Sequence, residues 1–161
     1  MKPSSKIKIF LVDDDLMFVK SLKHLLSEER REIKTFSCGE ECLKSINEQP
    51  SIIVLDYSLN NSLNGVQVLN RIKHSSPETK VIMLSGIVKP GIISDTIKYG
   101  AYDYIAKGEN WLLDVQKDIT TICDEIESTE QSDKDKRQVW WINGGIILVI
   151  LLMYIINRLK F

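Results

Sequence analysis

Short apolar runs alternate with amphipathic segments over the first 126 residues of the chain. Strongly apolar runs occupy residues 7–12, 52–55 and 81–84, and weaker ones occupy residues 33–36 and 102–106. Between these runs, apolar residues recur at the three- and four-residue spacing of one helix face. The pattern predicts five strands that alternate with five helices. Because the strongest runs are apolar at nearly every position, we expect a parallel sheet that is buried under helices on both faces.

A different pattern begins after residue 127. Residues 128–138 are polar and charged without an apolar face, which is typical of a linker or of a frayed helix extension. Residues 139–156 then form an 18-residue stretch with one Asn and no charge. A helix of that length spans about 27 Å, close to the hydrocarbon thickness of a bilayer. Trp140, Trp141 and Tyr154 stand near its ends, as in the aromatic belts of membrane proteins. The pattern predicts a C-terminal transmembrane helix, and a buried core helix is the alternative.

Composition narrows the class of protein. The chain has 161 residues, of which 43% are hydrophobic and 27% charged, as in an ordinary globular domain. Its 21 basic and 22 acidic residues give a net charge of -1, so we expect no nucleic-acid partner. The odd number of cysteines, Cys38, Cys42 and Cys123, favours reduced thiols, and with two histidines in the chain a zinc site is not expected.

Polar and charged residues that can bind ligands or take part in reactions stand where the predicted strands end. They are Asp13, Asp14 and Asp15 after the first strand, Asp56 after the third, Ser85 after the fourth and Lys107 after the fifth. The carboxyl ends of parallel strands form one edge of a sheet, which is where ligands bind. Clustered carboxylates suit a hard cation such as Mg²⁺. An ammonium beside them can neutralise the oxygens of an anion as charge develops.

The motifs IFLVDDD, IIVLDYSL, VIMLSG and KYGAYDYIAK, with their order and spacing, resemble the receiver domain of two-component response regulators. The resemblance covers residues 7 to about 126. It implies a doubly wound α/β fold with a five-stranded parallel sheet, of the flavodoxin-like kind. It also implies a Mg²⁺ site with these ligands: the carboxylates of Asp13, Asp14 and Asp56 and the backbone carbonyl of Ser58. We expect Asp15 to cap the first helix rather than to bind the metal.

The same resemblance implies a phosphoryl-transfer function. Asp56 would accept a phosphoryl group from a sensor histidine kinase or a phosphotransfer protein, forming an aspartyl phosphate. Lys107 and Ser85 would contact the phosphoryl oxygens, and Ser85 and Tyr104 would switch the face made by the fourth helix and fifth strand. The chain would then signal through contact with an unidentified downstream protein, and it would catalyse only its own phosphorylation and dephosphorylation.

The sequence departs from the family pattern at two positions. Gly108 stands where the family usually has a proline after the lysine, and Asn60 replaces a proline in the loop after Asp56. The segment 58–64 is about one residue longer than usual. Trp111 follows the fifth strand, and we do not expect it to report on metal binding.

Two other functions compete with a phosphoacceptor switch. A phosphatase of the haloacid dehalogenase type also uses an aspartate after its first strand, but Met17 stands where that family has Thr or Val. A non-phosphorylated scaffold would need neither Asp56 nor Lys107.

We therefore expect a receiver domain over residues 1–127, a charged linker over 128–138 and a single membrane-spanning anchor over 139–157. Phosphohistidine donors and Mg²⁺ are cytosolic, and residues 1–8 show no export signal. The receiver domain should therefore face the cytoplasm.

Overall fold

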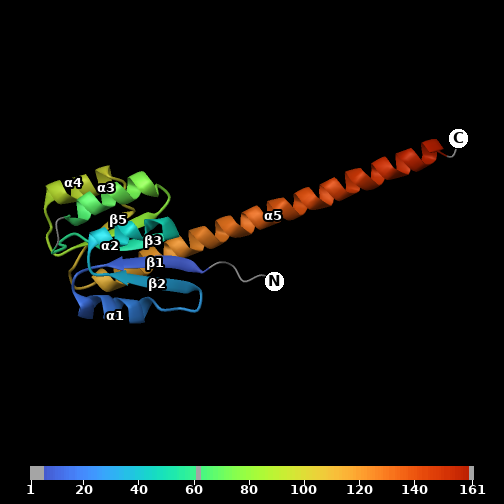
Figure 1. Ribbon diagram of the computed structural model, residues 1–161. Helices are drawn as coiled ribbons and strands as arrows, with labels where there is room; N and C mark the ends of the chain where they lie inside the picture. Colours follow the sequence, from blue (N-terminus) through green and yellow to red (C-terminus); the bar gives the residue numbers. More distant parts are fainter. Residues whose placement is uncertain (1–5, 61–62, 160–161) are drawn as a thin grey trace. The chain divides into compact units, whose positions relative to one another are not determined.

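The computed structural model describes residues 6–60 and 63–159, with side chains described as far as residue 141. Within these ranges, strands alternate with helices along the chain (Figure 1). In order, the elements are β1 (Ile7–Val12), α1 (Leu16–Leu26), β2 (Arg31–Phe36), α2 (Gly39–Lys44), the short 3-10 helix η1 (Ile46–Glu48), β3 (Ile52–Asp56), α3 (Gly65–Ser75), β4 (Lys80–Ser85), α4 (Pro90–Lys98), β5 (Asp103–Ala106) and α5 (Trp111–Leu159).

The strands form one parallel sheet. Over the described part of the chain, the sheet has five strands in the order β2-β1-β3-β4-β5. The strand order reverses between β1 and β3, where Val12 pairs with Leu55 near the carboxyl end of both strands. In open parallel sheets, ligands bind outside the carboxyl ends of the strands at such a reversal. The predicted five-stranded parallel α/β sheet is confirmed.

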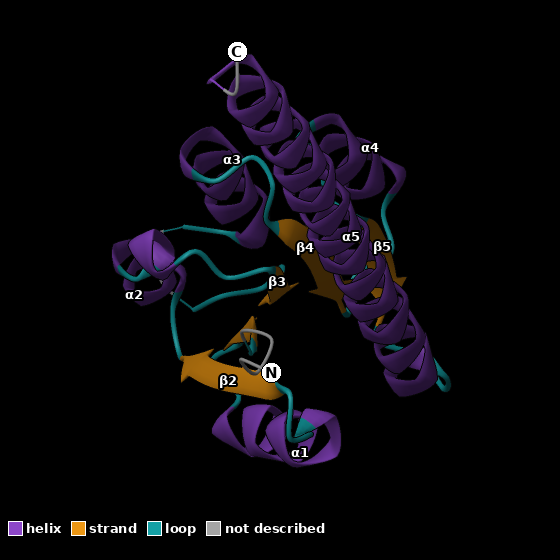
Figure 2. Cartoon of the chain, turned by 90° about the vertical axis from the view of Figure 1, so that its right-hand side faces the viewer, coloured by secondary structure: helices purple, strands orange, loops and turns teal. Residues whose placement is uncertain are grey.

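Both faces of the sheet are buried because side chains alternate along each strand. On one face, Phe10, Ile53 and Met83 belong to a buried apolar cluster that includes residues of α2 and α3. The alternate residues, such as Leu11 and Val54, are equally buried. Figure 2 shows α2, α3 and α4 on one side of the sheet and α1 on the other. This arrangement explains why the central strands are apolar at successive positions.

Strand β2 is the exception, and its place explains its weak sequence signal. It lies at the edge of the sheet and pairs with β1 from Arg31 to Phe36. Three of its six residues are exposed, since a neighbour covers it on one side only. The sequence predicted this strand over residues 33–36, two residues short of its start.

Two local features hold the loops at the carboxyl edge of the sheet. Asp15 caps α1, as predicted, because its side chain accepts hydrogen bonds from the backbone N–H groups of Met17 (2.9 Å) and Phe18 (3.1 Å). Gly65 begins α3 so close to the end of β3 that an added Cβ would lie 2.5 Å from the carbonyl oxygen of Asp56. The chain therefore needs glycine here to return toward the site.

Helix α5 is 49 residues long. The chain divides into two compact units, Met1–Ile122 and Cys123–Phe161, and the second consists of the continuation of this helix and the chain end. The boundaries predicted at residues 127 and 138 both fall within the helix. Among the side chains described, which end at Trp141, no helix is long and apolar enough to cross a membrane. Most of the predicted transmembrane segment 139–157 lies outside them.

Candidate functional site

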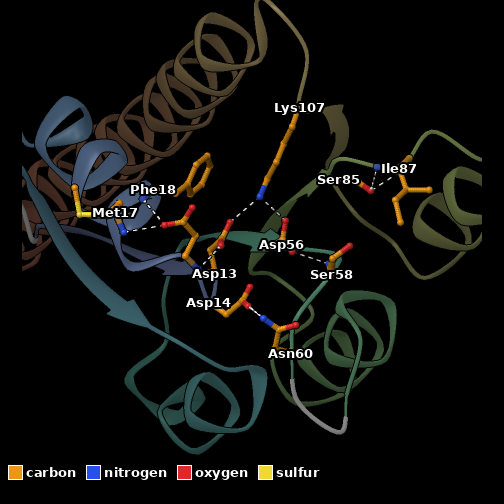
Figure 3. Close-up of polar contacts among 11 residues, drawn as sticks. Asp13, Asp14, Met17, Phe18, Asp56, Ser58, Asn60, Ser85, Ile87 and Lys107 are labelled. Carbon is orange, nitrogen blue, oxygen red and sulfur yellow. Dashed lines mark hydrogen bonds and ion pairs between the residues drawn. The ribbon is translucent and has the colours of Figure 1, made fainter.

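The site forms where β1, β3 and β5 end at the same edge of the sheet (Figure 3). Backbone hydrogen bonds continue the sheet pairing one residue further. The N–H of Tyr57, next to Asp56, donates to the carbonyl of Leu84 (2.8 Å), and the N–H of Lys107 donates to the carbonyl of Ser85 (2.8 Å). Asp13, Asp56 and Lys107 therefore leave the sheet from fixed backbone positions.

The Lys107 ammonium joins two carboxylates. Its Nζ lies 2.8 Å from Oδ2 of Asp13 and 2.6 Å from Oδ1 of Asp56. Both acids are only 4% exposed. The second oxygen of each carboxylate accepts a backbone N–H, from Asp15 onto Asp13 (2.9 Å) and from Ser58 onto Asp56 (2.6 Å). Each buried carboxylate is thus held by one ionic and one backbone contact, which fixes its orientation.

Burial and charge act against each other on these groups. Burial raises the pKa of Asp56 above its usual value, and the Asp13 charge adds to this rise. The Lys107 ammonium and the Ser58 N–H partly offset it. Burial alone would lower the pKa of Lys107, but Asp13 and Asp56 together raise it. The site therefore holds a firmly protonated lysine beside a carboxylate that has lost much of its hydration.

Asp14 turns away from this group. Its Oδ2 accepts a hydrogen bond from the Asn60 side-chain amide, and Figure 3 shows the two side chains pointing toward each other. In the described part of the chain, no three His, Cys, Asp or Glu side chains are grouped so that they could hold a metal ion. Of the predicted carboxylate ligands of the metal, the structure brings Asp13 and Asp56 together, while Asp14 lies apart from them.

The donor chemistry nevertheless suits Mg²⁺. Proteins commonly bind this ion through one or two carboxylates, with water and phosphate oxygens completing the octahedron, rather than through a cage of side chains. Asp13 and Asp56 supply two buried carboxylates that share one ammonium. Because one ammonium neutralises only one of the two carboxylates, a net negative charge stays on their hard oxygen atoms.

Ser85 and Tyr104 meet at one residue of the loop after β4. The fully buried Ser85 hydroxyl donates to the carbonyl of Ile87 and accepts from its N–H, both at 3.0 Å. The Tyr104 hydroxyl donates to the same carbonyl at 2.5 Å. The structure therefore connects the two predicted switch residues through Ile87, while the Ser85 hydroxyl makes its hydrogen bonds to this loop rather than to Asp56.

Sequence reasoning missed an aromatic pair beside the lysine. The Lys107 Nζ lies 4.4 Å from the centre of the Phe18 ring, and this ring stacks on Trp111 with 4.8 Å between centroids. Trp111 was not expected to report on metal binding, and the structure places it one ring away from Lys107. The sequence held one signal for this pair: Phe18 is an aromatic residue that directly precedes the core residue Val19 and lies outside the apolar stripe of α1.

Comparison with known proteins agrees with this geometry. The family described as the response regulator receiver domain matches residues 9–113. The chain belongs to this family of receiver domains. Members are typically phosphorylated by a kinase and bind Mg²⁺ at the phosphorylation site. They interact with histidine kinases and downstream effectors, and they are in general not catalytic enzymes.

Individual relatives show how the fold is used elsewhere. The chain is 31% identical over 103 residues to the chemotaxis protein CheY of Listeria monocytogenes, covering 63% of this chain and 86% of that protein. It is also 31% identical over 110 residues to a protein-glutamate methylesterase/protein-glutamine glutaminase of Trichodesmium erythraeum, covering 65% of this chain but 31% of the enzyme. The CheY-like receiver domain protein of Methanospirillum hungatei superposes with a TM-score of 0.70 at 29% identity, over 78% of this chain and 98% of that one.

Proposed function

We propose that this chain is a phosphoacceptor switch in which Asp56 receives a phosphoryl group from a histidine kinase or a phosphotransfer protein. The observation that carries the proposal is the environment of Asp56. It is a nearly buried carboxylate at the switch point of a parallel sheet, with an ammonium at 2.6 Å. Asp13, directly after the end of β1, pairs with the same ammonium. The geometry alone therefore does not say which of the two carboxylates is the nucleophile and which is a metal ligand. Membership of the receiver family favours Asp56.

The chemistry follows from these contacts. A carboxylate oxygen of Asp56 attacks the phosphorus of a phosphohistidine in line; the new O–P bond forms as the P–N bond breaks, and the electron pair leaves on the imidazole. Lys107 balances the negative charge on the phosphoryl oxygens. Asp13, Asp14, Asp56 and the Ser58 carbonyl are the groups that would hold Mg²⁺. When bound, this ion supplies further charge neutralisation at the same oxygens.

The contacts at Ile87 support a two-state output. Phosphorylation adds charge and acceptor oxygens next to Asp56. If the Ser85 hydroxyl turns to donate to one of them, it leaves both of its hydrogen bonds to Ile87. The Tyr104 hydroxyl then loses the fixed position of its acceptor. The β4–α4 loop and the Tyr104 ring are therefore the element whose equilibrium the phosphoryl group shifts, and we propose that a downstream protein reads it.

The test is phosphorylation of the purified chain with acetyl phosphate and Mg²⁺. We expect one hydroxylamine-labile phosphate per chain, which Asp56→Asn abolishes. Asp95→Asn, an exposed change on α4, is the matched control and should leave labelling unchanged. Labelling that survives Asp56→Asn but disappears in Asp13→Asn, together with sustained phosphoester turnover, would support the haloacid dehalogenase alternative instead. The absence of any phosphorylation would favour a scaffold.

We further propose that residues 139–157 anchor the chain in a membrane, with the receiver domain in the cytoplasm. The apolar stretch of the sequence is the main support. The described residues at its start add another, because Trp140 and Trp141 are each 75% exposed. Two neighbouring indoles that project into water are unfavourable, whereas the interface of a bilayer suits both their rings and their N–H groups. Output would then occur by protein contact near the membrane surface.

Fractionation of expressing cells tests the anchor. The full chain should resist carbonate extraction, and a chain that ends at Gln138 should be soluble and still accept phosphate from acetyl phosphate. A full chain that is monomeric without detergent would contradict the anchor. It would leave the phosphoacceptor proposal untouched.

A further inference from the structure

The loop between β5 and α5 carries Lys107 but packs loosely. Gly108, Glu109 and Asn110 are all exposed. At Gly108, the nearest atom that an added Cβ would meet is the Ala106 carbonyl oxygen, 4.0 Å away. The Gly108 N–H donates to this oxygen at 2.8 Å, a hydrogen bond that the proline usual in the family could not make. The backbone that follows Lys107 therefore makes few packing contacts that would fix the direction of the lysine side chain.

One aromatic ring contacts both ends of this loop. At the first end, the Lys107 Nζ lies 4.4 Å from the centre of the Phe18 ring. At the other end, Trp111 stacks on Phe18 with 4.8 Å between centroids and 28° between planes. Phe18 itself is fixed on α1, one residue before the fully packed Val19. Phe18, from the first helix of the chain, thus contacts this loop at both of its ends.

We propose that Phe18 is the positioning residue for Lys107, acting as a clamp with Trp111 that replaces the stiffness of the missing proline. The inference rests on the proposed function only in assigning phosphoryl transfer to the Lys107 site. The face of an aromatic ring attracts an ammonium, and it does so without neutralising it. The ring therefore steers Lys107 toward Asp13 and Asp56 while leaving its charge for the phosphoryl oxygens.

The alternative is that Phe18 merely fills space between α1 and α5. The two roles differ in what they require of the side chain. Space filling accepts an aliphatic group of similar size, whereas the clamp needs a π face. Leucine and tyrosine at position 18 therefore separate the roles, because tyrosine keeps the ring and leucine does not.

The experiment measures the rate constant for phosphorylation by acetyl phosphate, at saturating Mg²⁺, in the full chain kept in detergent. From the range of measured ammonium–ring energies, we expect Phe18→Leu to slow phosphorylation about tenfold. Phe18→Tyr should stay within about twofold of the unchanged chain on the same scale. The matched control is Tyr102→Leu, which removes a ring that lies 5.5 Å from the Lys80 ammonium near the amino end of β5. It should not alter the rate.

A second pair of variants keeps the test decisive if Phe18→Leu does not fold. Trp111→Leu should slow phosphorylation, and Trp111→Phe should preserve it, since phenylalanine can still stack on Phe18. Equal rates for the leucine and aromatic variants at both positions would overturn the clamp. Asp56→Asn, measured in parallel, separates the two proposals. If it abolishes phosphorylation while the leucine variants react normally, the phosphoacceptor proposal stands and the clamp fails.

Discussion

Replacing Lys107 by methionine removes the cation that the two buried carboxylates share. Asp13 and Asp56 are each 4% exposed, and their oxygens lie 2.8 and 2.6 Å from the Lys107 Nζ. Removing one partner of a buried ion pair typically destabilises a protein by about 3–5 kcal/mol, because a charge stays buried without compensation. The Lys107 side chain is 26% exposed, so water weakens the pairing. We therefore expect the free energy of unfolding at pH 8 to fall by about 2–3 kcal/mol.

The loss of unfolding free energy in Lys107→Met should depend on pH, and the pKa of Asp56 sets the direction of this dependence. Burial already raises the pKa of Asp56, and without the Lys107 ammonium this pKa must rise further. A group whose pKa is higher in the folded state contributes stability at low pH that is lost as pH rises through that folded pKa. At low pH, protonation of Asp56 relieves the repulsion that Lys107→Met creates. The difference between the two proteins should therefore be largest at pH 8 and smaller at pH 4.5.

Urea unfolding of the chain that ends at Gln138, followed by far-UV circular dichroism, measures this difference at both pH values. Lys134→Met is the matched control, because it removes an exposed lysine whose Nζ lies 3.8 Å from Glu130. Exposed pairs of this kind contribute about 0–1 kcal/mol, so the control should change little. If Lys107→Met unfolds at the same urea concentration as the unchanged chain at pH 8, or if the gap does not narrow at pH 4.5, the electrostatic account of the site is wrong.

Other features of the domain lead to further measurable outcomes. Gly65→Ala should lower the free energy of unfolding by about 2 kcal/mol, seen in the same urea assay, because its methyl group would lie 2.5 Å from the Asp56 carbonyl oxygen. Asn60→Ala releases Asp14, so Mg²⁺ titration followed by NMR should show about threefold tighter binding. Burial and a neighbouring carboxyl group raise the pKa of Asp118 to about 6. Stability should fall as pH rises through 6, and Asp118→Asn should flatten that step in a pH series of urea midpoints.

Much of the fold follows from the order of residues alone. Continuous apolar runs are stable only where both faces of a strand are covered, so the pattern at residues 7–12, 52–55 and 81–84 points to a parallel sheet. A parallel sheet in turn places the residues after its strands at one edge. That geometric rule is enough to bring Asp13, Asp56 and Lys107 together before any contact is known. The start of strand β2 was predicted two residues too late, because an edge strand needs fewer apolar positions.

The choice of partners within the site depended on the tertiary structure. Sequence patterning treats the acidic pair alike, but Asp13 ion-pairs with Lys107, 94 residues away, while Asp14 bonds to Asn60. The Phe18–Trp111 stack joins α1 to the start of α5, and it depends on how these helices pack. Periodicity describes which face of an element is buried. It carries no information about which side chains meet across two elements, because this depends on rotamers that the surrounding packing selects.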